Sequence, residues 1–262
     1  MRISSLTILA VEGLLILGSC GRQHNDGGPK AVGISCAPVR IALLLDQTDS
    51  TNWTRTPQLR PDDLDPLIEV IKRCGGELGL GLIRDQSNRP LVRLRLERPP
   101  EAPMAVNPLR ALKARPAYEQ SRAQWLAESA EQIRRFQGAA RVLLERPSHA
   151  RCTDVWGAVL RADLFLAEED PVWGPELSRW AVFVTDGQHN CGTAPVAMPS
   201  GARLAVVNGS ASLGALSRLN PLRFESPEAA FRFVEASASR GKDSLKAVRF
   251  SQQETSDARS HH

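Results

Sequence analysis

Residues 39–50 read Val-Arg-Ile-Ala-Leu-Leu-Leu-Asp-Gln-Thr-Asp-Ser. The stretch from Val39 to Leu45 is a nearly unbroken apolar run, which is typical of a β-strand buried on both faces. Strands of that kind belong to parallel sheets that helices cover on both sides. The run ends at Asp46 and gives way to small polar residues. The sequence therefore predicts a buried strand that ends in a carboxylate and hydroxyl groups.

The rest of the chain alternates between strand and helix patterns. Residues 92–96 alternate apolar side chains with arginine, which suits an antiparallel edge strand with one face in water. Apart from the hairpin that contains this strand, strands and helices alternate. That order predicts an α/β fold with a doubly wound, mostly parallel, Rossmann-like sheet, one antiparallel edge strand and helices on both faces. We expect further strands at 78–83, 180–185, 204–207 and 222–224, and helices at 62–74, 116–144, 154–166 and 227–237.

The first residues resemble an export signal. Arg2 precedes an apolar stretch over 3–17, interrupted by Glu12, and the stretch leads into Leu-Gly-Ser-Cys ending at Cys20. It is short for a membrane span, and its end resembles a bacterial lipobox, in which the cysteine receives a lipid. We expect a signal peptide over 1–19 and lipidation at Cys20, which would anchor the protein in the cell envelope, at the outer membrane in a Gram-negative cell. An ordinary cleaved signal with an incidental cysteine is the alternative.

The remainder divides into a polar tether at 20–36, one domain at 37–239 and a polar tail at 240–262. The domain carries a helical insert at about 99–145. The net charge of +4 is spread along the chain and interleaved with acidic residues, which argues against a nucleic-acid partner. An envelope location is oxidising, and four cysteines beyond Cys20 allow three disulfide pairings. They are Cys36, Cys74, Cys152 and Cys191.

Three polar features fall where predicted strands or helices begin or end. Asp46, Thr48 and Ser50 follow the first strand, Thr153 precedes a helix, and Asp186 ends a later strand within a Thr-Asp-Gly turn. Ligands of doubly wound sheets bind at the carboxyl ends of the strands. Two carboxylates and three hydroxyls form an all-oxygen set that suits a hard divalent cation, Mg²⁺ above all, with Mn²⁺ or Ca²⁺ as alternatives.

This order of residues resembles the metal-ion-dependent adhesion site of von Willebrand factor type A (VWA) domains. Asp46-x-Thr48-x-Ser50 is similar to the family's D-x-S-x-S motif. Thr153 matches the lone threonine of the family, and Asp186 matches its later aspartate. The departure is Thr48, which replaces a serine but keeps a hydroxyl. The resemblance covers roughly residues 37–238, and the insert is longer than the family norm.

The resemblance implies a binding module rather than an enzyme. In the family, the hydroxyls contact the ion directly when a partner is bound, and the aspartates act largely through waters. The ion then accepts an Asp or Glu carboxylate from a partner protein, which suggests adhesion or assembly at the cell envelope. The implied fold also places two cysteines at each end of the sheet. It therefore selects the pairs Cys36–Cys74 and Cys152–Cys191, the second of them beside the metal loops.

Two other functions stay open. A strand that ends in Asp46 faintly resembles the nucleophile loop of haloacid dehalogenase-like phosphatases, but those usually carry a second aspartate where this chain has Thr48. No Ser-His-Asp or Cys-His arrangement stands out in the sequence, so we assign no catalytic residue. The other alternative is a VWA scaffold without metal, because each motif taken singly is common as a helix cap or a turn.

Overall fold

The computed structural model describes residues 36–48, 51, 56–103, 108–145, 150, 152–208 and 213–240. The expected signal peptide, the lipidation site Cys20, the tether up to residue 35, the candidate ligand Ser50 and the tail beyond residue 240 lie outside these residues. The predictions made for them stay predictions. Among the described residues, no helix has both the length and the apolar character needed to cross a membrane.

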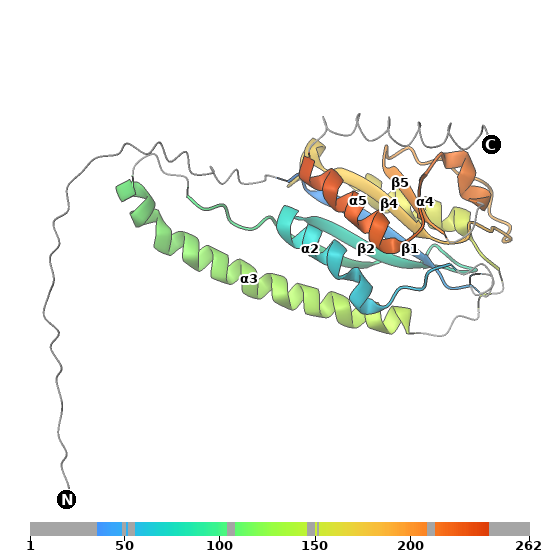
Figure 1. Cartoon of the computed structure of the whole chain (residues 1–262), viewed down its shortest axis with the longest axis horizontal. Helices are drawn as coiled ribbons and strands as arrows, with labels where there is room; N and C mark the ends of the chain where they lie inside the picture. Colours follow the sequence, from blue (N-terminus) through green and yellow to red (C-terminus); the bar gives the residue numbers. More distant parts are fainter. Residues whose placement is uncertain are drawn as a thin grey trace, which may run out of the picture. The chain divides into compact units, whose positions relative to one another are not determined.

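A six-stranded sheet in the order β3-β2-β1-β4-β5-β6 forms the centre of the fold (Figure 1). All neighbouring strands are parallel except β2 and β3, which confirms the predicted α/β sheet with one antiparallel edge strand. The strands are β1 (Val39–Asp46), β2 (Gly76–Ile83), β3 (Val92–Leu96), β4 (Ser178–Val184), β5 (Arg203–Val207) and β6 (Leu222–Phe224). The helices are α2 (Asp65–Cys74), α3 (Pro108–Leu144), α4 (Val155–Ala167) and α5 (Pro227–Arg240), with 3-10 turns η1 (Pro61–Leu64), η2 (Gly174–Glu176) and η3 (Gly214–Leu219).

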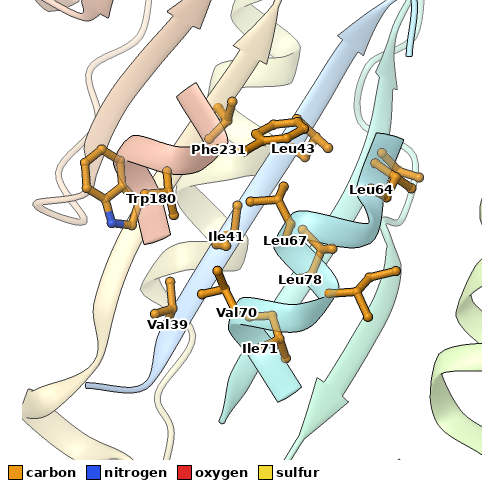
Figure 2. Close-up of a cluster of buried hydrophobic side chains, with 14 of the residues drawn as sticks. Val39, Ile41, Leu43, Leu64, Leu67, Val70, Ile71, Leu78, Trp180 and Phe231 are labelled. Carbon is orange, nitrogen blue, oxygen red and sulfur yellow. The ribbon is translucent and has the colours of Figure 1, made fainter. Parts of the chain in front are cut away.

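Helices cover both faces of the sheet, and β1 is buried along its whole length. On one face, alternate β1 residues such as Ile41 and Leu43 share a buried cluster with residues of α2 and α5 (Figure 2). The second half of α3 joins the same cluster and lies against β3. On the other face, Ala42 and Leu44 pack with α4. Successive side chains of a strand point to opposite faces, so the apolar run of β1 contributes to both cores. This double burial explains why the run is continuous rather than alternating.

Glycines on β2 let α4 approach the sheet closely. A methyl group added to Gly79 would lie 3.0 Å from the ring of Phe165, and one added to Gly81 would lie 2.2 Å from the guanidinium of Arg161. That guanidinium donates hydrogen bonds to two backbone carbonyl oxygens of the β2–β3 hairpin. Burial lowers the pKa of Arg161 to about 10. Because Gly79 and Gly81 carry no side chain, α4 can pack this closely against the sheet.

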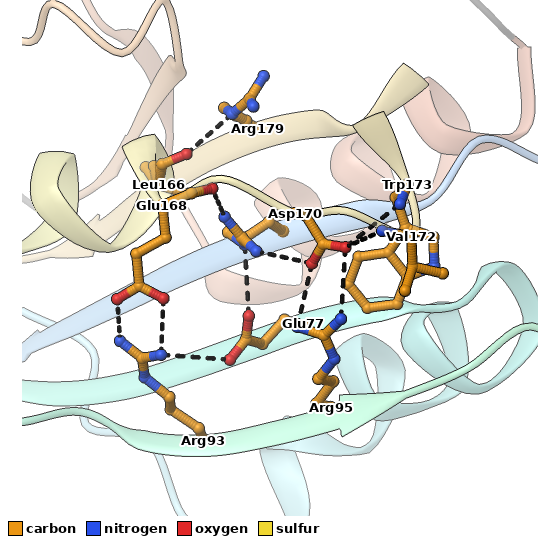
Figure 3. Close-up of polar contacts among 10 residues, drawn as sticks. Glu77, Arg93, Arg95, Leu166, Glu168, Asp170, Val172, Trp173 and Arg179 are labelled. Atoms are coloured by element: carbon orange, nitrogen blue, oxygen red, sulfur yellow. Dashed lines mark hydrogen bonds and ion pairs between the residues drawn. The ribbon is translucent and has the colours of Figure 1, made fainter. Parts of the chain in front are cut away.

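A buried charge interrupts the apolar run of β1. The side chain of Arg40 is only 1% exposed. Its guanidinium lies 3.3 Å from Glu77 and 3.0 Å from Asp170, two acidic residues that are labelled in Figure 3. It also donates to the backbone carbonyl of Glu168. Two arginines of the edge strand β3 pair with the same three acidic residues. They are Arg93 and Arg95. Three arginines thus face three carboxylates, which compensates the cost of burying Arg40.

The arginine face of β3 is only partly in water. Arg93 and Arg95 are 42% and 43% exposed, because they reach the acidic residues that follow α4. Burial alone would raise the pKa of Asp170, but hydrogen bonds from two backbone N–H groups and the charge of Arg95 lower it below its usual range. The alternating pattern of β3 predicted the edge position, but not these ion pairs.

Helix α3 begins earlier than we predicted. The apolar periodicity placed the expected start at about residue 116, but the helix begins at Pro108 and contains Pro116. The second half buries Phe136 and Ala140, whereas Leu112 in the first half is 64% exposed. A solvent-exposed stretch of helix carries no apolar periodicity, so the first two turns could not be recognised from that pattern.

Asp170→Asn should destabilise the fold mainly above the pKa of an ordinary aspartate, about 4. The folded-state pKa of Asp170 is lowered, so its ionised form stabilises the fold above the unfolded-state pKa. This stabilisation is lost as the pH falls through the folded-state pKa. We expect Asp170→Asn to lower the free energy of unfolding at neutral pH by about 3 kcal/mol. Urea titrations at decreasing pH should show the difference from wild type shrinking. The control Asp62→Asn, at an exposed position of η1, should show little change; a pH-independent difference for Asp170→Asn would contradict the assignment.

Candidate metal centre

The carboxylate of Asp46 stands at the end of β1 and holds two neighbouring loops. One oxygen accepts hydrogen bonds from the backbone N–H of Thr48 at 3.0 Å and from the Thr48 hydroxyl at 2.6 Å. The other oxygen accepts from the hydroxyl of Thr185 at 2.6 Å. All three residues are buried. Because β1 and β4 are adjacent and parallel, their carboxyl ends meet at one edge of the sheet, and these hydrogen bonds join the loops that follow them.

The described candidate ligands meet around this carboxylate. The hydroxyl of Thr153 donates to the hydroxyl of Thr48 at 3.1 Å, so Thr153, Thr48 and Asp46 form a continuous chain of hydrogen bonds. Asp186 is 2% exposed and close enough for its charge to act on Asp46. Ser50 lies outside the described residues. Four of the five predicted ligands therefore lie at the same edge of the sheet.

The carboxyl group of Asp46 is buried and lies near a second carboxylate. Burial raises the pKa of its carboxyl, and hydrogen bonds from Thr185 and Thr48 lower it in part. The negative charge of Asp186 raises it again, and the result lies above the usual range. Two neighbouring carboxylates are costly to bury unless a proton or a cation reduces their repulsion. A proton or a cation at this edge would lower that cost.

Thr153 is not the cap of α4, although its sequence position allowed that role. The cap is Asp154, whose carboxylate accepts a hydrogen bond from the backbone N–H of Gly157 at 2.9 Å. The hydroxyl of Thr153 is directed instead to Thr48. The two neighbouring residues therefore have different roles. Asp154 caps the helix, and Thr153 faces the candidate site.

The loop after β4 holds Thr153 in place. A disulfide joins Cys152 to Cys191, with Cα atoms 5.3 Å apart. Beside it, the side-chain oxygen of Asn190 accepts the backbone N–H of Thr153 at 2.6 Å. The backbone N–H groups of Asn190 and Cys191 donate to the carbonyl oxygen of Thr153 at 3.3 and 3.4 Å. Both backbone polar groups of Thr153 are therefore fixed, and with them the origin of its side chain.

No protein-family model and no curated protein matches this chain. The VWA resemblance therefore stays a prediction that rests on the order of the motifs. Among the described residues, no three His, Cys, Asp or Glu side chains gather as a metal site. An ion at this edge would thus depend on the hydroxyls of Thr48 and Thr153 as well as on Asp46 and Asp186.

Two residues that we did not assign from the sequence contribute to the centre. Thr185 donates to Asp46 and also accepts the backbone N–H of Gly187 at 3.0 Å, and its position at the end of a buried strand was a usable signal. Asn190 gave no such signal, because its contact with Thr153 spans 37 residues. Both disulfides in the structure are the pairs that the resemblance selects, namely Cys36–Cys74 and Cys152–Cys191.

Asn190→Ala should loosen the backbone at Thr153. The variant removes the acceptor of the Thr153 N–H, and the loss of one hydrogen bond is worth about 1 kcal/mol, or roughly fivefold in local opening. Amide hydrogen exchange at Thr153 should accelerate by about that factor, while exchange in β1 stays unchanged. Gln188→Ala, at an exposed position of the same loop, serves as the control. Equal exchange at Thr153 in wild type and Asn190→Ala would contradict a clamping role for Asn190.

Proposed function

We propose that this chain is a metal-dependent binding module of the VWA type that attaches a partner protein at the cell envelope. The observation that carries the proposal is the hydrogen-bonded chain Asp46–Thr48–Thr153 with Asp186 beside it. These residues come from three separate segments of the chain, yet all four are buried at one edge of the sheet. A structural role alone does not require two neighbouring carboxylates there.

The chemistry of the donor set supports Mg²⁺, with Mn²⁺ or Ca²⁺ as alternatives. The carboxylates of Asp46 and Asp186 and the hydroxyls of Thr48 and Thr153 are hard oxygen ligands, which these cations prefer. Ser50 is proposed as a further ligand. A bound cation would offer a partner's Asp or Glu carboxylate a place among its ligands. The residues of this chain would hold the ion and keep the two acidic groups from repelling each other.

The envelope location is supported by two features. The export-like segment that ends at Cys20 predicts a lipid anchor, with residues 20–36 as the tether. The two disulfides fit an oxidising compartment, because such bonds are rare in reducing ones. An anchored module of this kind would present its metal centre to partners on the same membrane or on the facing surface.

Mg²⁺ should stabilise the fold through this centre. A ligand that binds only the folded state adds about 1.4 kcal/mol at ten times its Kd. Titration with MgCl₂ should therefore raise the melting temperature of the wild type. Asp46→Asn and Thr153→Val nearly keep the side-chain volume but lose the charge or the hydroxyl, so they should respond weakly. Thr193→Ala, at an exposed position of the loop after β4, is the matched control and should respond like the wild type. An unchanged melting temperature at millimolar metal would argue against an accessible site.

A pull-down from the native envelope tests the binding role. We expect a partner that the wild type retains in Mg²⁺ and releases in a chelator, and that Asp46→Ala and Thr153→Ala do not retain. Identical partners for all three proteins, with no effect of the chelator, would refute metal-bridged binding. Metal-dependent turnover of a phosphate ester would instead favour the phosphatase alternative.

A further inference from the structure

A pocket of about 430 Å³ lies beside the candidate metal centre. Its walls come from Trp156 on α4, from residues 187–189 after β4, and from part of η3. Trp156 lies about one helical turn after Thr153, and the loop at 187–189 directly follows Asp186. The pocket and the metal centre therefore share two of the segments that build them.

Glycine backbone fixes the two sides of the pocket against each other. Gly187 and Gly214 have φ angles of +73° and +51°, which favour glycine. A methyl group added to either would lie 2.1 Å from a backbone oxygen of the other segment. The backbone N–H of Ala215 donates to the carbonyl of Gly187 at 2.8 Å. Because Gly187 directly follows Asp186, the close backbone contact between Gly187 and η3 also holds the pocket next to Asp186.

The lining of the pocket is positively charged, in contrast to the metal centre. Arg218 is exposed, and its guanidinium carries a permanent positive charge. Among the described residues that line the pocket there is no Asp or Glu to balance this charge. Arg218 makes no ion pair with any residue that the structure describes. Trp156 is 3% exposed and adds an apolar surface. A site of this composition suits a side chain with an aliphatic stem and a negative end.

We infer that this pocket receives an acidic side chain of the partner, close in sequence to the carboxylate that reaches the metal centre. The inference rests on the proposed function. In an extended segment, side chains two positions apart point the same way and lie about 7 Å apart. A short extended segment can therefore bring one carboxylate to the centre and another to Arg218. The partner class is then a segment with two neighbouring carboxylates, rather than one with a lone Asp or Glu.

A peptide-display selection tests this preference. The library carries one fixed aspartate between randomised positions, and it is selected on the full chain in MgCl₂ and eluted with EDTA. The wild type should enrich acidic residues near the fixed aspartate, and Arg218→Glu should enrich basic ones. Arg232→Glu, at an exposed position of α5, makes the same charge change on the opposite face of the sheet and should select like the wild type. For one selected peptide, Arg218→Ala should raise the Kd about fivefold, the value of a surface ion pair of about 1 kcal/mol.

The outcomes separate this inference from the proposed function. EDTA-eluted peptides without an acidic preference, or with the same preference in Arg218→Glu, would overturn the inference and leave metal-bridged binding intact. If no peptide elutes with EDTA, or if Asp46→Ala selects the same peptides, metal-bridged binding fails and the inference fails with it. A charge preference that reverses only in Arg218→Glu supports both.

Discussion

A carboxylate that leaves water needs hydrogen-bond donors or an opposite charge, and Asp46 meets this need at the end of the central strand. Its donors are Thr48 in its own loop and Thr185 in the neighbouring one. The hydrogen bonds that the Asp46 carboxylate accepts therefore hold the two loops next to each other. Thr153 joins the same chain of hydrogen bonds through Thr48. The polar edge of the sheet is therefore organised by the burial of a single side chain.

Strand β1 carries two buried charges whose surroundings differ. Arg40 is neutralised by carboxylates, with Asp170 at 3.0 Å and Glu77 at 3.3 Å. Asp46 is held by neutral hydroxyls and has a second carboxylate, Asp186, nearby. In the first arrangement, the positive charges of Arg40 and the two β3 arginines are balanced by three carboxylates. The second brings two carboxylates together at the carboxyl end of the strand, which is why we propose the binding site there and not at the other end.

The fold class could be predicted because burial on both faces of β1 appears directly in its composition. The candidate ligands could be located because parallel strands bring their carboxyl ends to one edge. The parts that escaped prediction depend on partners far along the chain. Arg40 is compensated by Asp170, which lies 130 residues later, and Asn190 fixes Thr153 across 37 residues. The first two turns of α3 escaped for another reason, since an exposed stretch of helix carries no apolar pattern.

The disulfide between Cys152 and Cys191 joins two segments that are far apart in the sequence. These cysteines are 39 residues apart, one ahead of α4 and the other beyond β4. They come within bonding range once α4 has packed on the sheet and β4 has paired with β1. The bond between these two positions therefore requires the loop that carries Thr153 and the loop that follows Asp186 to lie side by side. Once formed, the bond keeps these two loops covalently joined even when the hydrogen bonds between them open.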